Sequence, residues 1–152
     1  MPRTYKSSAL DAMDKKIIEV LLLDARISIK ELANRVQLSA PSVSERVERL
    51  QERGIIRRFT VEIDPVSLGY GLQALVRIKP LPGKLQVVQK LIEDTPEFSE
   101  CSKVTGNDCF IARLHVFTIS HLDQILDRVS RYAECNTSIV KAQPVRGRLP
   151  PF

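Results

Sequence analysis

The sequence contains no tryptophan, three cysteines and two histidines, and its longest hydrophobic runs are four residues. A membrane-spanning helix needs about 20 apolar residues, so no span is expected. The first sixteen residues hold no apolar stretch of the kind found in signal peptides. We therefore expect a globular cytoplasmic protein.

The scarcity of cysteine and histidine also argues against a metal centre or a cofactor site. The number of cysteines is odd, and none of the three, Cys101, Cys109 and Cys135, belongs to a C-x-x-C pair. This spacing excludes a disulfide framework and does not fit a zinc site. His115, within a β-like run, is better explained as a half-exposed strand residue than as a catalytic one.

An enzyme is the least favoured class of function. The sequence shows no paired carboxylates on one strand, no nucleophile with its base and no glycine-rich phosphate loop. We therefore predict a binding protein and no catalytic residues.

Basic residues are concentrated at one end of the chain. The net charge is +5, and residues 1–60 hold 12 Lys and Arg against 8 Asp and Glu, whereas the remainder holds 11 against 10. A basic excess confined to one part of a chain suggests a polyanionic partner for that part.

Three helices are predicted in the first part of the chain, each preceded by a capping residue. Asp11, Ser28 and Ser39 stand where a side-chain oxygen can accept from the first free amides of a helix. Only Gln37 and Leu38 separate the second helix from the third, and Gly54 follows the third. Two helices joined by so short a turn predict a helix-turn-helix.

The remainder alternates between extended and helical patterns in the order β-α-β-β-α-β. This order predicts a ferredoxin-like domain, with the last helix capped by Ser120. The fold class is therefore α+β, an N-terminal (winged) helix-turn-helix domain followed by a ferredoxin-like domain. We place the boundaries at 1–59 for the first domain, 60–72 for the linker and 73–152 for the second domain.

The third predicted helix carries its arginines and its glutamates on separate edges. At about 100° per residue, Val43, Val47 and Leu50 form one narrow stripe, the arginines a second and the glutamates a third. Surface i,i+4 pairs alone would explain such a helix if it were isolated, but within a helix-turn-helix it predicts a DNA-facing surface. Arg46 is assigned to a base edge, and the other arginines to phosphates. The predicted DNA-binding residues are Ser39, Ser42, Ser44, Arg46, Arg49, Arg53, Arg57 and Arg58.

Taken in order, these segments resemble the Lrp/AsnC (leucine-responsive, feast/famine) family of prokaryotic transcription regulators. The resemblance includes Asp24-Ala25-Arg26, Glu31-Leu32-Ala33 and Gly54-Ile55-Ile56, continues through "IDPVSLG" and "VTGNDCF", and covers nearly the whole chain. It implies a DNA-binding domain joined to an effector and assembly domain, homodimers that often join into octamers, and a nucleoid-associated location.

The resemblance also implies a small-molecule effector, usually an amino acid, near the turn between the second and third strands. We expect effector contacts from Thr105, Gly106, Asn107 and Asp108, with Thr137 and Ser138 on the last strand as further contributors. Turn amides suit a carboxylate, and Asp108 suits an ammonium group. Here the sequence departs from the family's G-x-x-D pattern, because Asp108 stands one place early and Cys109 occupies the usual position.

A nucleoid-compacting protein with little sequence preference and no effector shares most of these features and remains the alternative.

Overall fold

A computed structural model describes residues 10–145, 147 and 149–152. The predicted domains also include residues 1–9, 146 and 148, which lie outside this range. The chain divides into two compact units, residues 1–62 with 150–152 and residues 63–149. Each unit has its own hydrophobic core. Within the described part, no helix has the length and apolar character needed to cross a membrane.

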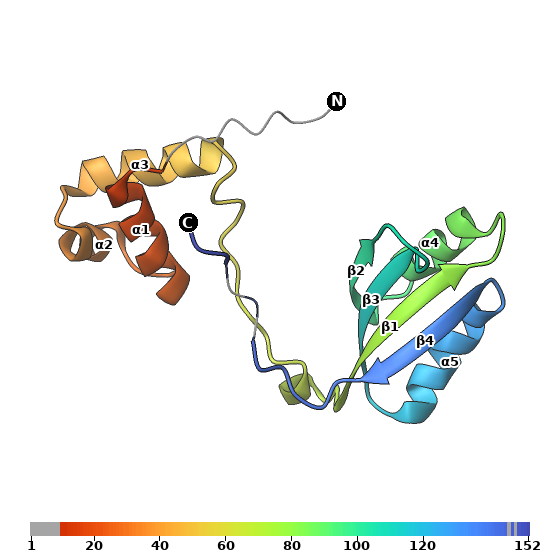
Figure 1. The fold of residues 1–152 in the computed structure, drawn as a ribbon. Coiled ribbons are helices and arrows are strands. Elements are labelled where there is room, and N and C mark those ends of the chain that lie inside the picture. Colours follow the sequence, from red (N-terminus) through yellow and green to blue (C-terminus); the bar gives the residue numbers. More distant parts are fainter. Residues whose placement is uncertain (1–9, 146, 148) are drawn as a thin grey trace. The chain divides into compact units, whose positions relative to one another are not determined.

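The first unit is built from three helices, α1 (Ala12–Leu23), α2 (Ile29–Val36) and α3 (Ala40–Glu52) (Figure 1). The predicted caps are confirmed, since the side chains of Asp11, Ser28 and Ser39 accept from Asp14, Glu31 and Ser42 amides respectively. The turn between α2 and α3 is tight because Gln37 adopts a left-handed conformation with φ 57°. These features form the predicted helix-turn-helix.

A single apolar cluster holds the three helices together. Ile17 of α1, Leu32 of α2 and Leu50 of α3 are fully buried, and Val43 and Val47 pack with them. Burying each such side chain contributes about 1.5–3 kcal/mol. The stripe predicted for α3 is therefore its core-facing side, which leaves both charged edges outside the core.

The second unit is a four-stranded antiparallel sheet backed by two helices. It consists of β1 (Leu72–Pro80), α4 (Leu85–Glu93), β2 (Phe98–Lys103), β3 (Phe110–Val116), α5 (Ile119–Ser130) and β4 (Ala133–Ile139). The strand order is β2-β3-β1-β4, which confirms the ferredoxin-like prediction. Figure 1 shows α4 and α5 on the same side of the sheet. Val76 and Leu114 are buried on the face that these helices cover, whereas Leu75 and Ile111 are exposed on the other face.

The structure corrects one detail of the prediction. Thr118, and not Ser120, caps α5, because its hydroxyl accepts from the amide of His121 at 3.1 Å and the helix begins at Ile119. The segment after α3 contains no assigned strand between residues 55 and 64. Phe59, Val61 and Ile63 are exposed there.

The segment leading into β1 is anchored to the second unit by aromatic stacking. A short 3-10 helix, η1 (Val66–Leu68), ends at Gly69 with φ 95°. The next residue, Tyr70, stacks on Phe117 with ring centroids 4.3 Å apart, and Phe117 in turn stacks on His121 at 5.6 Å. His121 also lies 3.3 Å from a Glu97 carboxylate oxygen. This chain of contacts fixes where the connecting segment meets the sheet.

Candidate DNA interface and effector turn

The predicted DNA-binding serines lie at the start of α3. Ser39 is the N-cap, and its hydroxyl accepts from the Ser42 amide at 3.4 Å. The Ser44 hydroxyl donates to Glu48 at 3.4 Å, one helical turn later. Ser42 is half-buried. All three hydroxyls are therefore at the N-terminal end of the second helix of the motif, the end that approaches bases in helix-turn-helix proteins.

Arg46 makes two short ionic contacts with α1 and its cap. Its Nη1 donates to Oδ2 of Asp11 at 2.6 Å and to Oδ1 of Asp14 at 2.7 Å. Only 23% of the Arg46 side chain and 3% of the Asp14 side chain are exposed, whereas Asp11 is half exposed. The sequence assigned Arg46 to a base edge, but the structure places its guanidinium against two carboxylates of α1 and its cap.

The charges of this cluster perturb one another in the expected directions. The hydrogen bond from Arg46 lowers the pKa of the Asp11 carboxyl, and the Asp14 amide acts in the same direction. Hydrogen bonds to Asp11, and then to Asp14, raise the pKa of Arg46. Both shifts favour the charged forms of Asp11 and Arg46, so this pair is ionised at neutral pH.

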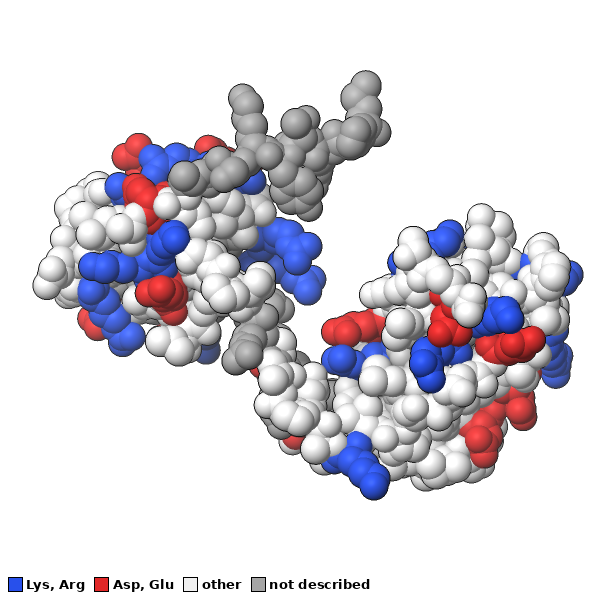
Figure 2. Space-filling view, viewed as in Figure 1, with Lys and Arg blue, Asp and Glu red and all other residues white. Residues whose placement is uncertain are grey.

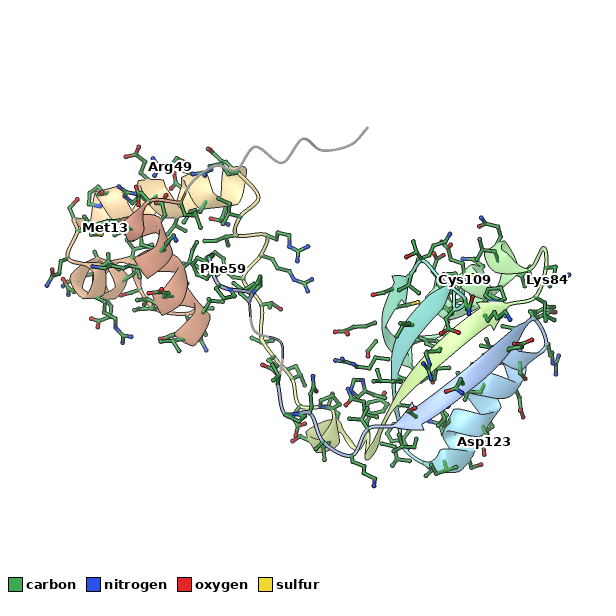
Figure 3. All side chains as sticks on the ribbon, viewed as in Figure 1. Met13, Arg49, Phe59, Lys84, Cys109 and Asp123 are labelled. Carbon is green, nitrogen blue, oxygen red and sulfur yellow. The ribbon has the colours of Figure 1, made fainter. Side chains whose placement is uncertain are left out.

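The other arginines are less enclosed. Arg49, labelled in Figure 3, is partly exposed, and its Nη2 lies 3.4 Å from Asp14. Arg53 is the C-cap of α3. Arg57 and Arg58 follow on the exposed segment. In Figure 2 acidic side chains lie among the basic ones on this unit, so its visible surface is mixed in charge.

The predicted effector turn connects β2 to β3. Val104 donates to the carbonyl of Cys109 at 2.9 Å, which closes the turn. Gly106 has φ 113°, a conformation that L side chains rarely adopt, and apart from its two chain neighbours no described residue has an atom within 4 Å of the position that a Cβ would take. Thr105 and Asn107 are exposed. Asp108 is partly buried, and no described residue bonds its carboxylate.

Cys109 is partly buried and packs against the core of the second unit (Figure 3). Its amide donates to the carbonyl of Ile78 at 3.2 Å. The thiol that replaces the family's acid is therefore in contact with the core and is not a free group of the turn.

Thr137 and Ser138 do not join the turn within one chain. They pair with Val76 and Leu75, and β1 separates β4 from the β2–β3 hairpin. Phe110, where the turn enters β3, is level with Cys135 of β4, two strand spacings away. Ser138 lies three residues further along β4, so its distance from Phe110 is about 14 Å. Because adjacent residues of a strand point to opposite faces, only one of the two can face a given ligand. The expected contribution of Thr137 and Ser138 to the same turn therefore does not arise within one chain.

A helix-turn-helix unit followed by a βαββαβ unit defines a DNA-binding regulator with a separate ligand-binding domain. Residues 10–57 match the model for winged helix-turn-helix DNA-binding domains, and residues 73–150 match the Lrp/AsnC ligand binding domain. The chain belongs to the Lrp/AsnC family of transcription regulators.

Individual relatives align with this chain over most of their length. The HTH-type transcriptional regulator LrpC of Bacillus subtilis is 30% identical over 131 residues, which cover 86% of this chain and 91% of LrpC. The regulator LrpA of Mycobacterium tuberculosis is 31% identical over 86% of this chain and 88% of its own.

Two solved structures show the same fold. The structure of LrpC from B. subtilis has a TM-score of 0.85 at 28% identity, and the alignment covers 91% of this chain and 99% of LrpC. A feast or famine regulatory protein from M. tuberculosis, complexed with L-methionine, has a TM-score of 0.83 at 28% identity, with 93% and 99% covered. This chain is accordingly a DNA-binding transcription regulator with a ligand-binding domain.

Proposed function

We propose that the protein is an oligomeric regulator whose α3 enters the DNA major groove and whose DNA affinity responds to an amino acid. The observation that carries the DNA part is the position of α3 as second helix of the motif, with its apolar stripe buried and its serines and arginines outside the core. The DNA target implies a cytoplasmic, nucleoid-associated location, and binding without catalysis.

In this proposal Ser42 and Arg49 approach the DNA directly, because both lie on the polar side of α3 and are partly exposed. Ser39 and Ser44 lie beside them, and their hydroxyls keep acceptor capacity for further bonds. Arg53, Arg57 and Arg58 extend the basic surface toward phosphates.

We assign the effector to the turn of Thr105, Gly106, Asn107 and Asp108. The open space around Gly106 admits a ligand close to the backbone, and Asp108 offers a carboxylate that no described residue occupies. The M. tuberculosis relative complexed with L-methionine supports an amino acid as the effector. Because Thr137 and Ser138 are distant within one chain, they contribute only if a second copy brings its own last strand to this turn.

We further propose that pairs of chains associate through the sheet face that α4 and α5 leave open. Leu75 and Ile111 are 39% and 41% exposed on that face. They lie diagonally across the β1–β3 pair, since Leu75 is opposite Arg113 and Arg77 is opposite Ile111. Dimers formed in this way would join into octamers through further contacts, among them the effector turns.

The effector proposal is tested by a thermal-shift screen of the twenty amino acids, because a ligand of the folded state raises the melting temperature. Calorimetry then compares the best amino acid on the wild type and on Asp108→Ala. Loss of heat in that variant, with the oligomer intact, supports the site. Unchanged affinity in Asp108→Ala and in Gly106→Leu would place the effector elsewhere.

The DNA proposal is tested by selecting duplexes from a random pool and footprinting the enriched sequence. A defined footprint supports a sequence-specific regulator. Uniform protection of every duplex, together with no hit in the amino-acid screen, would instead favour the architectural nucleoid protein.

A further inference from the structure

The contacts of Arg46 give it a role different from those of the other arginines of α3. Two carboxylates, from the cap and the first turn of α1, meet one nitrogen of its guanidinium at 2.6 and 2.7 Å. Those carboxylates lie 35 and 32 residues away in the sequence, so the contact ties two separate helices together. Arg49 approaches the same Asp14 from one turn further along α3.

The burial of Asp14 makes the loss of these contacts costly. Asp14 is 2% exposed, and an unpaired carboxylate at that position would carry a large desolvation cost. Asp11 has a double role, because one oxygen accepts from the Asp14 amide at 2.7 Å while the other accepts from Arg46. The N-terminus of α1 and the middle of α3 are therefore held at a fixed distance and rotation.

The apolar core alone does not fix that rotation as tightly. Val43, Val47 and Leu50 face α1 and α2 through nondirectional contacts, so a small rotation of α3 costs little in buried area. Short charge-assisted hydrogen bonds restrict it, because they weaken steeply when their geometry changes. The rotation of α3 decides which side chains of its polar side meet the DNA.

We infer that Arg46 is a positioning residue, which holds α3 in its DNA-reading orientation through Asp11 and Asp14 and does not itself contact DNA. The inference rests on the proposal that α3 faces the major groove. It replaces the base contact that the sequence alone assigned to Arg46. The raised pKa of Arg46 and the lowered pKa of Asp11 agree with this geometry.

The sharpest test is Asp11→Asn, because the two roles predict opposite signs. Asparagine caps helices as well as aspartate does, so α1 is preserved, and Asp11 is half exposed. Removing a negative charge beside a DNA surface strengthens binding if Arg46 is thereby freed for the DNA. If Arg46 positions α3, the same change weakens binding to the selected duplex severalfold. It then also lowers the ratio of selected-duplex to random-duplex affinity.

Glu31→Gln is the matched control. Glu31 is also an exposed carboxylate of this unit, and it pairs with Arg35 on its own helix at 3.4 Å. Its removal changes the charge by the same amount and leaves the Arg46 cluster intact. We expect binding of the selected duplex to be unchanged or slightly tighter in this variant.

The salt dependence of binding provides a second measurement. Each phosphate contact contributes about 0.9 to the slope of log affinity against log salt. Arg46→Met should therefore weaken the selected duplex without changing that slope, and Arg46→Lys should restore part of the loss. In Arg49→Met the slope should fall by about 0.9.

Each outcome of these experiments decides the inference. Unchanged or tighter binding by Asp11→Asn would overturn it, and so would a slope in Arg46→Met reduced by one phosphate contact. If Arg46→Met does not fold, the Asp11→Asn and Glu31→Gln pair decides alone. A wild-type chain that bound no duplex at all would instead overturn the proposed function, and the inference with it.

Discussion

Removing Arg57 and Arg58 together should lower DNA affinity in a strongly salt-dependent way. Both side chains are exposed just after α3, and no described carboxylate pairs with either one. If each neutralises one phosphate, the double variant Arg57→Ala/Arg58→Ala loses about 1.8 from the slope of log affinity against log salt. Between 50 and 200 mM salt, the affinity ratio of wild type to variant should then shrink by about 12-fold.

Fluorescence anisotropy on a labelled duplex at several salt concentrations measures this slope. The fold should not change, because substitutions of exposed residues usually shift stability by less than about 0.5 kcal/mol. Arg128→Ala/Arg131→Ala is the matched control, since it removes two exposed charges near the end of α5. A slope equal to wild type in the Arg57/Arg58 variant, or an equal decrease in the control, would refute a phosphate role for this pair.

Three further predictions concern the second unit. Leu75→Glu, on the open sheet face, should yield monomers by light scattering, and a dimer of unchanged affinity would exclude that face. Burial, and then Arg113, lower the pKa of His115, so its neutral form is favoured on folding. Its contribution to stability should be complete above about pH 6.5 and lost as pH falls through the lowered pKa; urea melts should show a flatter profile in His115→Gln. Phe117→Ala should cost about 2 kcal/mol in urea unfolding through lost stacking and burial, and a loss below about 0.5 kcal/mol would mean that the stack does not anchor the segment before β1.

Local features of the sequence were sufficient to predict most of the elements. The caps Asp11, Ser28 and Ser39 act on amides only three residues away, so their effect is present in the local pattern. The apolar periodicities of α3 and of the two helices behind the sheet depend on the same short range. The order of elements then limited the topology, because β-α-β-β-α-β units adopt few sheet arrangements.

The candidate sites depended more on contacts between distant parts of the chain. The sequence placed Arg46 on a polar edge of α3, and this edge is the one that meets Asp11 and Asp14. Helical periodicity describes one helix at a time, so it cannot distinguish an arginine that faces DNA from one that faces another helix. Asp14, three residues after the cap of α1, was the only local signal, and its burial is visible only after folding.

The prediction of the effector residues likewise depended partly on local sequence and partly on tertiary structure. The turn at Gly106 was predicted correctly, because its residues act locally on backbone conformation. The distance from that turn to Thr137 and Ser138 was set by strand order, which inserts β1 between β3 and β4. The sequence by itself determined the helices, the strands and the family, since these rest on short-range patterns. The tertiary structure alone decided which charges are neutralised within the protein and which remain for a partner, because that depends on contacts made only when the helices pack.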